Sequence, residues 1–205
     1  VSCQVLSIDL AIDLRGVTVL PGLIDGHVHL DWYFNRKGRF HTRGDGDAPG
    51  QSMLAAAANA YATLMNGFTT VQSLGANVDA DLREYIATQG LPGPRVLTSL
   101  DAFNENSGGP DSLRVLVRLR KSQGADAVKL FASKSIREGG AQTMTDAQLV
   151  AACGEAKSIG LRSIVHAHSA ASMKAAANAG CDQIEHGVLA DQEALDLMAA
   201  KGMYF

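Results

Sequence analysis

The stretch TDAQLVAACGEAKSIGLRSIVHAHSAASMKAAANAGCDQIEHG, residues 145–187, contains the same structural unit twice. In each unit a long amphipathic run is followed by a glycine and then by a short apolar run. The long runs predict helices and the short runs predict strands. Gly160 and Gly180 suit the left-handed position that ends a helix. The stretch therefore predicts helix–strand–helix–strand, an order typical of parallel sheets with helical crossovers.

The same alternation continues on both sides of this stretch. Strands are predicted at residues 17–30, 69–74, 95–100, 127–132, 163–168 and 183–188. Helices are predicted at residues 52–65, 79–89, 112–123, 146–159, 171–179 and 191–201. Thr145 and Gln148 are a predicted capping box, because Ser or Thr followed three residues later by Glu or Gln is the signature of that motif.

Two architectures fit strict alternation, a doubly wound open sheet and a TIM (β/α)8 barrel. The first typically carries a G-x-G-x-x-G loop after a strand, and no such loop follows any predicted strand. Polar side chains instead gather at the C-terminal ends of several strands, which is where barrel active sites lie. The fold class is therefore predicted as α/β, of the TIM-barrel type.

The barrel is expected to be incomplete. The chain offers about six β-α units and, at residues 203–205, the start of a seventh strand, whereas a closed barrel needs eight. Residues 1–18 are interpreted as the remnant of a flanking β-sandwich with a lead-in strand, and residues 19–205 as a partial barrel domain with strands 1–6 and the start of strand 7. Open strand edges invite pairing, which leaves room for a homo-oligomer.

Composition and charge exclude several classes of partner. The chain has 205 residues, 46% of them hydrophobic, and a formal net charge of −3. Near-balanced charge argues against nucleic acid or a membrane surface as a partner, and no apolar run approaches the ~18 residues that span a bilayer. Cys3, Cys153 and Cys181 are odd in number and scattered, so they are predicted to be packing residues and not a disulfide framework. The compartment stays unassigned, with a slight preference for the cytoplasm.

Five of the six histidines lie at predicted strand C-termini. His27 and His29 are two residues apart on one strand, so their side chains share a face. His166 and His168 repeat this spacing, and His186 ends the last predicted strand. Hydrogen-bonded strand residues would explain a single H-x-H pair equally well. The clustering at several strand ends favours a metal site, because neutral imidazole is a common metal ligand.

Lys129 lies in an apolar strand, AVKLFAS. A buried lysine charge costs several kcal/mol unless it is paired or neutralised. A lowered pKa would neutralise it, and carbamylation by CO₂ would convert the amine into an anionic ligand with two oxygens. A third interpretation is an ion pair with a buried carboxylate, such as that of Asp25.

Four motifs in this order, PGLIDGHVHL (21–30), VKLF (128–131), VHAHS (165–169) and IEHG (184–187), resemble the amidohydrolase superfamily. The similarity is greatest to imidazolonepropionase-like and prolidase-like binuclear members, and it covers nearly the whole chain. The resemblance implies a metal-dependent hydrolase with two divalent ions, usually zinc. The implied metal ligands are His27 and His29 on the first ion, carboxylated Lys129 between both, and His166 and His186 on the second.

The resemblance also implies a catalytic role for His168, which would polarise the substrate carbonyl or hold a substrate carboxylate. The reverse assignment of His166 and His168 stays open. Members of the superfamily carry a general acid/base Asp after strand eight, which is expected beyond Phe205. Asp25 shares the face of His27 but lies deeper, so it is expected beside the ligands. Glu185 alternates to the opposite face from His186, so it is expected to contact the surrounding helices.

Two segments after predicted strands are candidates for substrate binding. Residues 31–50 carry Tyr33, whose ring could wall a pocket, and residues 133–140 carry Arg137, which could bind a carboxylate. Other aromatic and cationic residues of the first segment are Trp32, Phe34, Arg36, Arg39 and Arg43. A solvated surface loop is the alternative interpretation of that segment.

Three functions remain open at this point. The first is a binuclear amidohydrolase that hydrolyses the C–N bond of a small dipeptide-like or N-acyl amino-acid substrate. The second is a cyclic-amide hydrolase of the imidazolonepropionase type, which Lys129 disfavours because mononuclear members usually lack a bridging lysine. The third is a catalytically incomplete metal-binding fragment that lacks the strand-eight Asp.

Overall fold

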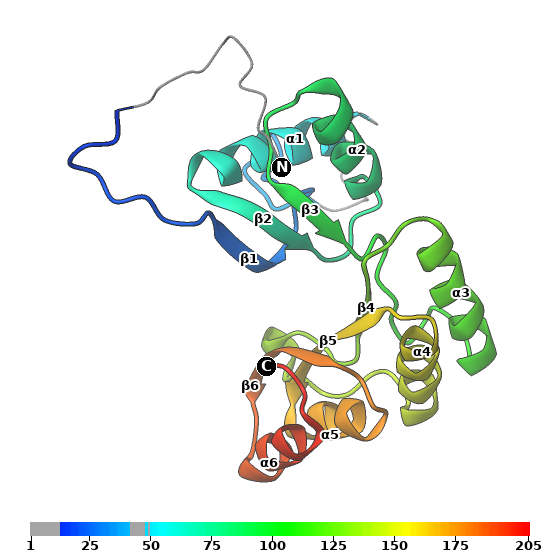
Figure 1. Ribbon diagram of the computed structural model, residues 1–205. Coiled ribbons are helices and arrows are strands. Elements are labelled where there is room, and N and C mark those ends of the chain that lie inside the picture. The colour runs from blue at the N-terminus through cyan, green and yellow to red at the C-terminus, as the bar shows by residue number, and fades with distance from the viewer. Residues whose placement is uncertain (1–12, 42–47, 49) are drawn as a thin grey trace, which may run out of the picture.

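The computed structural model describes residues 13–41, 48 and 50–205. Within those residues the fold is α/β, with six parallel strands and six α-helices in alternation (Figure 1). The strands are β1 (Leu23–Val28), β2 (Phe68–Ser73), β3 (Arg95–Thr98), β4 (Ala127–Phe131), β5 (Arg162–Ser169) and β6 (Gln183–Leu189). The helices are α1 (Gln51–Met65), α2 (Asp79–Gln89), α3 (Pro110–Ser122), α4 (Asp146–Ser158), α5 (Ala170–Asn178) and α6 (Gln192–Lys201).

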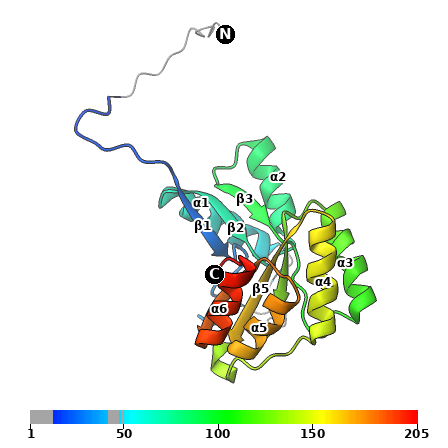
Figure 2. The ribbon, with the colours of Figure 1, turned by 60° about the horizontal axis from the view of Figure 1, so that its bottom comes forward.

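The strands form two three-stranded sheets, ordered β1-β2-β3 and β4-β5-β6. The chain that follows β3, and not β3 itself, runs beside β4: the Phe103 amide donates to the Lys129 carbonyl (2.9 Å) and the Phe131 amide to the Phe103 carbonyl (2.8 Å). Helices α3–α6 lie along the second sheet (Figure 2). All six strands thus point the same way, so their C-terminal ends meet at one side of the molecule.

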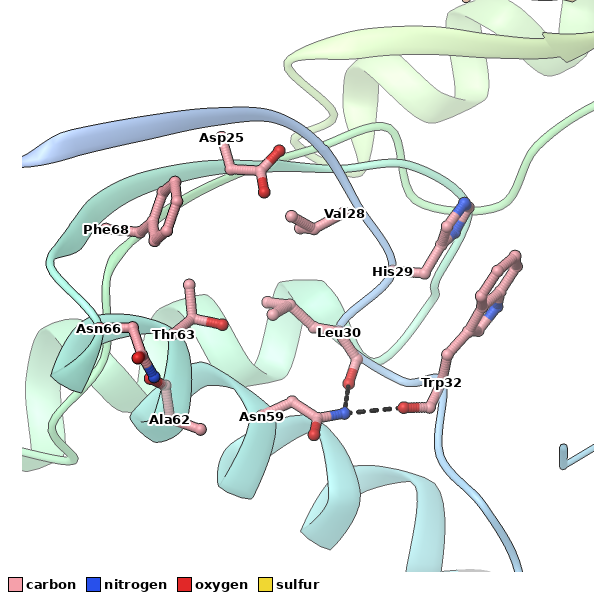
Figure 3. Close-up of a pocket in the computed structure, with 10 residues that line it drawn as sticks. All are labelled: Asp25, Val28, His29, Leu30, Trp32, Asn59, Ala62, Thr63, Asn66 and Phe68. Atoms are coloured by element: carbon pink, nitrogen blue, oxygen red, sulfur yellow. Dashed lines mark hydrogen bonds between the residues drawn. The ribbon is translucent and has the colours of Figure 1, made fainter. Parts of the chain in front are cut away.

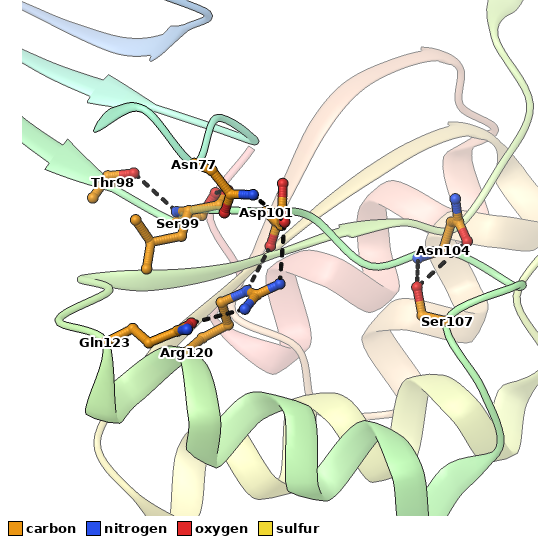
Figure 4. A network of polar contacts seen from close by, with 9 residues as sticks. Asn77, Thr98, Ser99, Asp101, Asn104, Ser107, Arg120 and Gln123 are labelled. Carbon is orange, nitrogen blue, oxygen red and sulfur yellow. Dashed lines mark hydrogen bonds and ion pairs between the residues drawn. The ribbon is translucent and has the colours of Figure 1, made fainter. Parts of the chain in front are cut away.

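A polar network fixes the segment between β3 and α3 (Figure 4). The Arg120 guanidinium donates to the carbonyl (3.3 Å) and to Oδ2 (3.4 Å) of Asp101, and its Nη1 donates to Gln123 Oε1 (2.8 Å). The Asn77 amide also donates to Asp101 Oδ2. This loop is therefore held to α3 by side-chain hydrogen bonds.

Local signals in the sequence account for several boundaries. The capping box is confirmed: the Gln148 amide donates to Thr145 Oγ1 (3.2 Å) and the Thr145 amide to Gln148 Oε1 (2.9 Å). The first strand is shorter than predicted, since residues 13–22 contain no strand. Val19 and Leu20 are 68% and 75% exposed there, because β1 pairs with β2 alone among the described strands. Most of the predicted N-terminal remnant lies outside the described residues.

The larger hydrophobic core lies between α3–α6 and the second sheet, and it contains a disulfide between Cys153 and Cys181. The prediction that these cysteines are unpaired packing residues is wrong. Helix α4 and the start of β6 pack into one core, which brings the two Cα atoms to 5.0 Å. Disulfides persist in oxidising compartments, so the cysteines no longer favour the cytoplasm. Cys3 lies outside the described residues.

Removal of this disulfide is expected to lower the free energy of unfolding. The bridge joins residues 28 positions apart, and closing a loop of that size stabilises a protein by about 3–4 kcal/mol. Urea unfolding of a Cys153→Ala/Cys181→Ala variant measures the loss. A reductant should destabilise the parent chain to the same level and leave the variant unchanged; equal stability of parent and variant would contradict the expectation.

No helix within the described part of the chain is long and apolar enough to cross a membrane.

Candidate metal centre

Five histidines face one cavity of about 1030 Å³ at the C-terminal ends of β1, β5 and β6. His27 and His29 come from β1 and the residue after it, His166 and His168 from β5, and His186 from β6. The rings of His27, His166 and His168 each lie 4.8–5.1 Å, centroid to centroid, from the ring of His186. The structure therefore brings together all five histidines that the sequence places at strand ends.

The first pair has the spacing of two ligands of one ion. His27 Nε2 and His29 Nε2 are 3.3 Å apart. Two nitrogens bound tetrahedrally at about 2.0–2.1 Å from one zinc ion lie roughly 3.3–3.4 Å apart. A flat stack with Trp32, at 3.8 Å between ring centroids, holds the His29 ring in place. The pair fits a single divalent ion in both donor type and separation.

Three of the histidines, His29, His166 and His186, have pKa values well below the usual range of imidazole. Burial, with smaller contributions from His27, Lys129 and other imidazoles, lowers the pKa of His29 to about 3. Burial also lowers the pKa of His166 and of His186 to about 4, and neighbouring imidazoles and Lys129 add to the effect. A neutral imidazole offers a nitrogen lone pair to a metal ion. The nitrogen lone pairs of these three imidazoles are therefore available to bind a cation.

Lys129 is fully buried in β4, close enough to His29, His166 and His186 to lower the pKa of each. Its Nζ has no hydrogen-bond partner, and burial lowers the pKa of the amine to about 8, against a smaller opposing effect of Glu185. The interpretation that Asp25 pairs with this amine is wrong, since Nζ has no such contact and Asp25 Oδ1 accepts from the His27 amide (3.0 Å). The structure therefore leaves a buried amine without a hydrogen-bond partner, and its lowered pKa makes the neutral form more accessible than in an exposed lysine.

The site contains one residue that the sequence placed elsewhere. Glu185 was expected to face the helices, but its Oε2 lies 2.6 Å from His27 Nδ1 and it lines the same cavity as His186. Strict alternation fails because His186 has a left-handed φ of 75° and Gly187 follows with 55°. A glycine inside a strand pattern often marks such an irregularity, and Gly187 was the signal that could have predicted it.

The chain is similar in sequence to a known family of proteins. The sequence profile of the Amidohydrolase family matches residues 18–205. The chain belongs to the Amidohydrolase family. Ochratoxinase of Aspergillus niger is 28% identical over 237 residues, which cover 93% of this chain and 48% of the relative. This amidohydrolase chain thus spans about half the length of the curated relatives it matches.

Solved structures give the same result. A Xaa-Pro dipeptidase with bound methionine superposes with a TM-score of 0.78 and 30% identity, over 90% of this chain and 52% of the other. A prolidase complexed with N-methylphosphonate-L-proline gives a TM-score of 0.82 and 25% identity, over 96% and 56%. These neighbours imply a TIM-barrel fold, in agreement with the parallel α/β arrangement of the amidohydrolase chain.

The two predicted substrate residues lie in different surroundings. Arg137 lines the histidine cavity of the amidohydrolase chain, as do four aromatic side chains: Trp32, Phe34, Phe40 and Phe131. Tyr33 is not among the described residues that line it; its ring stacks on His41 at 4.5 Å. Arg43 lies outside the described residues. The cavity therefore combines an apolar wall with one cationic side chain at its rim.

Asp25 faces a second pocket of about 430 Å³, between β1 and α1 (Figure 3). On its other side the Asn59 amide donates to the carbonyls of Leu30 and Trp32, both at 2.8 Å, and so fixes the chain that leaves β1. Within the described part of the amidohydrolase chain, no three His, Cys, Asp or Glu side chains are grouped so that they could hold a metal ion.

Proposed function

We propose that the chain is the metal-binding part of an amidohydrolase that cleaves the C–N bond of a dipeptide-like or N-acyl amino-acid substrate. The observation that carries this proposal is a fully buried amine, Lys129 Nζ, that has no hydrogen-bond partner and lies close enough to His29, His166 and His186 to lower the pKa of each. Such a costly group is retained where it has a chemical role. Family membership and the dipeptidase and prolidase neighbours support the same reaction class.

The donor set fits two divalent ions, zinc above all. His27 and His29 would hold the first ion, and His166 and His186 the second. Lys129, carboxylated on Nζ, would supply the anionic oxygen ligands that the histidines alone lack. When bound, the ions would generate a hydroxide nucleophile and polarise the carbonyl of the substrate.

The remaining residues of the cavity would orient the substrate. His168 is buried, its Nδ1 has no hydrogen-bond partner, and its ring lies parallel to that of His186. An imidazole in this position would lie beside the two metal ions and could donate to the substrate carbonyl or its carboxylate. Arg137 would bind a carboxylate at the rim, and the aromatic wall would cover the apolar part of the substrate.

Two alternative functions can be distinguished from this proposal. The residues that line the histidine cavity include Glu185 but no aspartate in the described part of the chain. A metal-binding unit without a complete catalytic set is the first alternative. Cyclic amides of the imidazolone kind are the other alternative, and the buried Lys129 disfavours it.

Metal content tests the proposal directly. The chain prepared with zinc and bicarbonate is expected to retain about two zinc equivalents, and a His27→Ala/His29→Ala variant about one. His41→Ala is the matched control, because His41 does not line the histidine cavity. Hydrolysis of N-acyl amino acids, compared with the same compounds amidated at the carboxylate, tests the substrate class. Less than one equivalent in folded protein would refute the proposal.

A further inference from the structure

Within the described part of the chain, a hydrogen bond between Glu185 and His27 links the second sheet to a histidine of the first. Glu185 Oε2 lies 2.6 Å from His27 Nδ1, and the side chains of His27 and Glu185 are only 19% and 12% exposed. A carboxylate only accepts hydrogen bonds. His27 Nδ1 must therefore carry a proton and donate it, and in the neutral ring this leaves the Nε2 lone pair free.

The free lone pair of His27 lies next to His29, the other proposed ligand of the first ion. His27 Nε2 is the atom that lies 3.3 Å from His29 Nε2. We infer that Glu185 is a positioning residue: it fixes the tautomer and the ring orientation of His27 so that Nε2 can bind a divalent cation together with His29. This inference rests on the metal site of the proposed function. Partners of this kind orient a ligating imidazole and raise its basicity.

A chain of side chains holds Glu185 itself. The Gln183 amide donates to Glu185 Oε1, so only Oε2 is left for His27. Arg162 donates to Gln183 Oε1 (3.4 Å) and to Gln72 Oε1 (2.6 Å). The Gln72 amide in turn donates to the Gly26 carbonyl (2.9 Å), directly before His27.

These contacts close a ring through β1, β2, β5 and β6, which we call the Glu185 ring (Gly26, His27, Gln72, Arg162, Gln183 and Glu185). The ring fixes both the backbone before His27 and the imidazole of His27. The carboxylate of Glu185 is thereby held in one orientation, as a positioning group requires.

A glutamine at position 185 would not fix the tautomer of His27. A glutamine presents either an oxygen or an NH₂ group to His27 Nδ1. In the second case His27 would carry its proton on Nε2 and direct an N–H at the metal position. Glu185→Gln therefore keeps the size of the side chain and removes only the control over the tautomer.

Two readouts test this role. In metal-free chain with ¹⁵N-labelled histidine, the His27 ring is expected to show the Nδ1-protonated tautomer, and Glu185→Gln is expected to lose that preference. The zinc affinity of the variant should fall about 10–100-fold. Trp32, the single tryptophan of the chain, stacks on His29 and so reports zinc binding by its fluorescence.

Matched variants separate positioning from folding. Glu193→Gln removes an exposed carboxylate on α6, which pairs with Lys174 (2.7 Å), and should leave zinc affinity unchanged. Gln183→Met keeps the carboxylate but frees Oε1, and should weaken zinc binding less than Glu185→Gln does. It keeps the inference testable if Glu185→Gln does not fold.

The outcomes are distinct. Zinc binding by the parent chain with unchanged affinity and tautomer in Glu185→Gln would overturn the inference and leave the proposed function standing. A parent chain that binds no zinc would overturn both.

Discussion

Replacing Lys129 by methionine is expected to stabilise the metal-free chain by about 3 kcal/mol at pH 7 and to abolish binding of the second zinc equivalent. Burial lowers the pKa of this amine from 10.5 to about 8, and each pKa unit corresponds to about 1.4 kcal/mol. Above pH 10.5 the amine is neutral in both the folded and the unfolded state. As the pH falls from 10.5 to about 8, the unfolded chain takes up a proton that the folded chain resists, so stability is lost. Below about 8 both states hold the proton and the loss is complete.

The gain from Lys129→Met should therefore shrink as the pH rises from 8 towards 10.5. Urea unfolding in the presence of a chelator, at several pH values, measures it. Lys157→Met is the control, because Lys157 is exposed on α4, where substitutions change stability by about 0.5 kcal/mol or less. A destabilised Lys129→Met chain would mean that an interaction of the amine stabilises the fold.

The second large effect separates the two histidines of β5. His166→Asn is expected to reduce bound zinc from about two equivalents to one, whereas His168→Asn is expected to keep both and slow hydrolysis about 10²–10³-fold. Burial is the largest cause of the lowered pKa of both residues; His186, His168 and Lys129 add to it for His166, whereas burial alone acts on His168.

Zinc content by mass spectrometry and hydrolysis of an N-acyl amino acid give the two measurements. Asn keeps a polar side chain of similar size in each variant, so packing is disturbed equally. The reverse pattern, with zinc lost in His168→Asn and kept in His166→Asn, would exchange the roles of the two residues.

The sequence predicts most of the fold because its local signals agree with the final packing. The Thr145–Gln148 capping box, Gly160 and Gly180 mark boundaries that the structure keeps, and the alternation gives the parallel order of the strands. The length of β1 was not predictable in this way. Apolar residues 17–22 satisfy the strand pattern, but a strand also needs a partner, which the local pattern does not contain.

The candidate site was predictable where one residue type repeats at strand ends, and not where contacts are long-range. Five histidines and Lys129 stand out in the sequence, and the structure gathers them at one place. The Cys153–Cys181 pairing depends on how α4 packs against the start of β6. The position of Glu185 depends on one left-handed backbone angle at His186.

The proposed ligands are divided between the two sheets, so metal binding would depend on the packing of one sheet against the other. His27 and His29 come with β1, whereas Lys129, His166 and His186 come with β4–β6. A pair of ions bridged by Lys129 could bind only after the two sheets have packed together, so the free energy of metal binding would add to the free energy of folding. A partly folded chain would bind neither the ions nor the water that they activate. Hydrolysis would therefore begin only once both sheets are folded and packed.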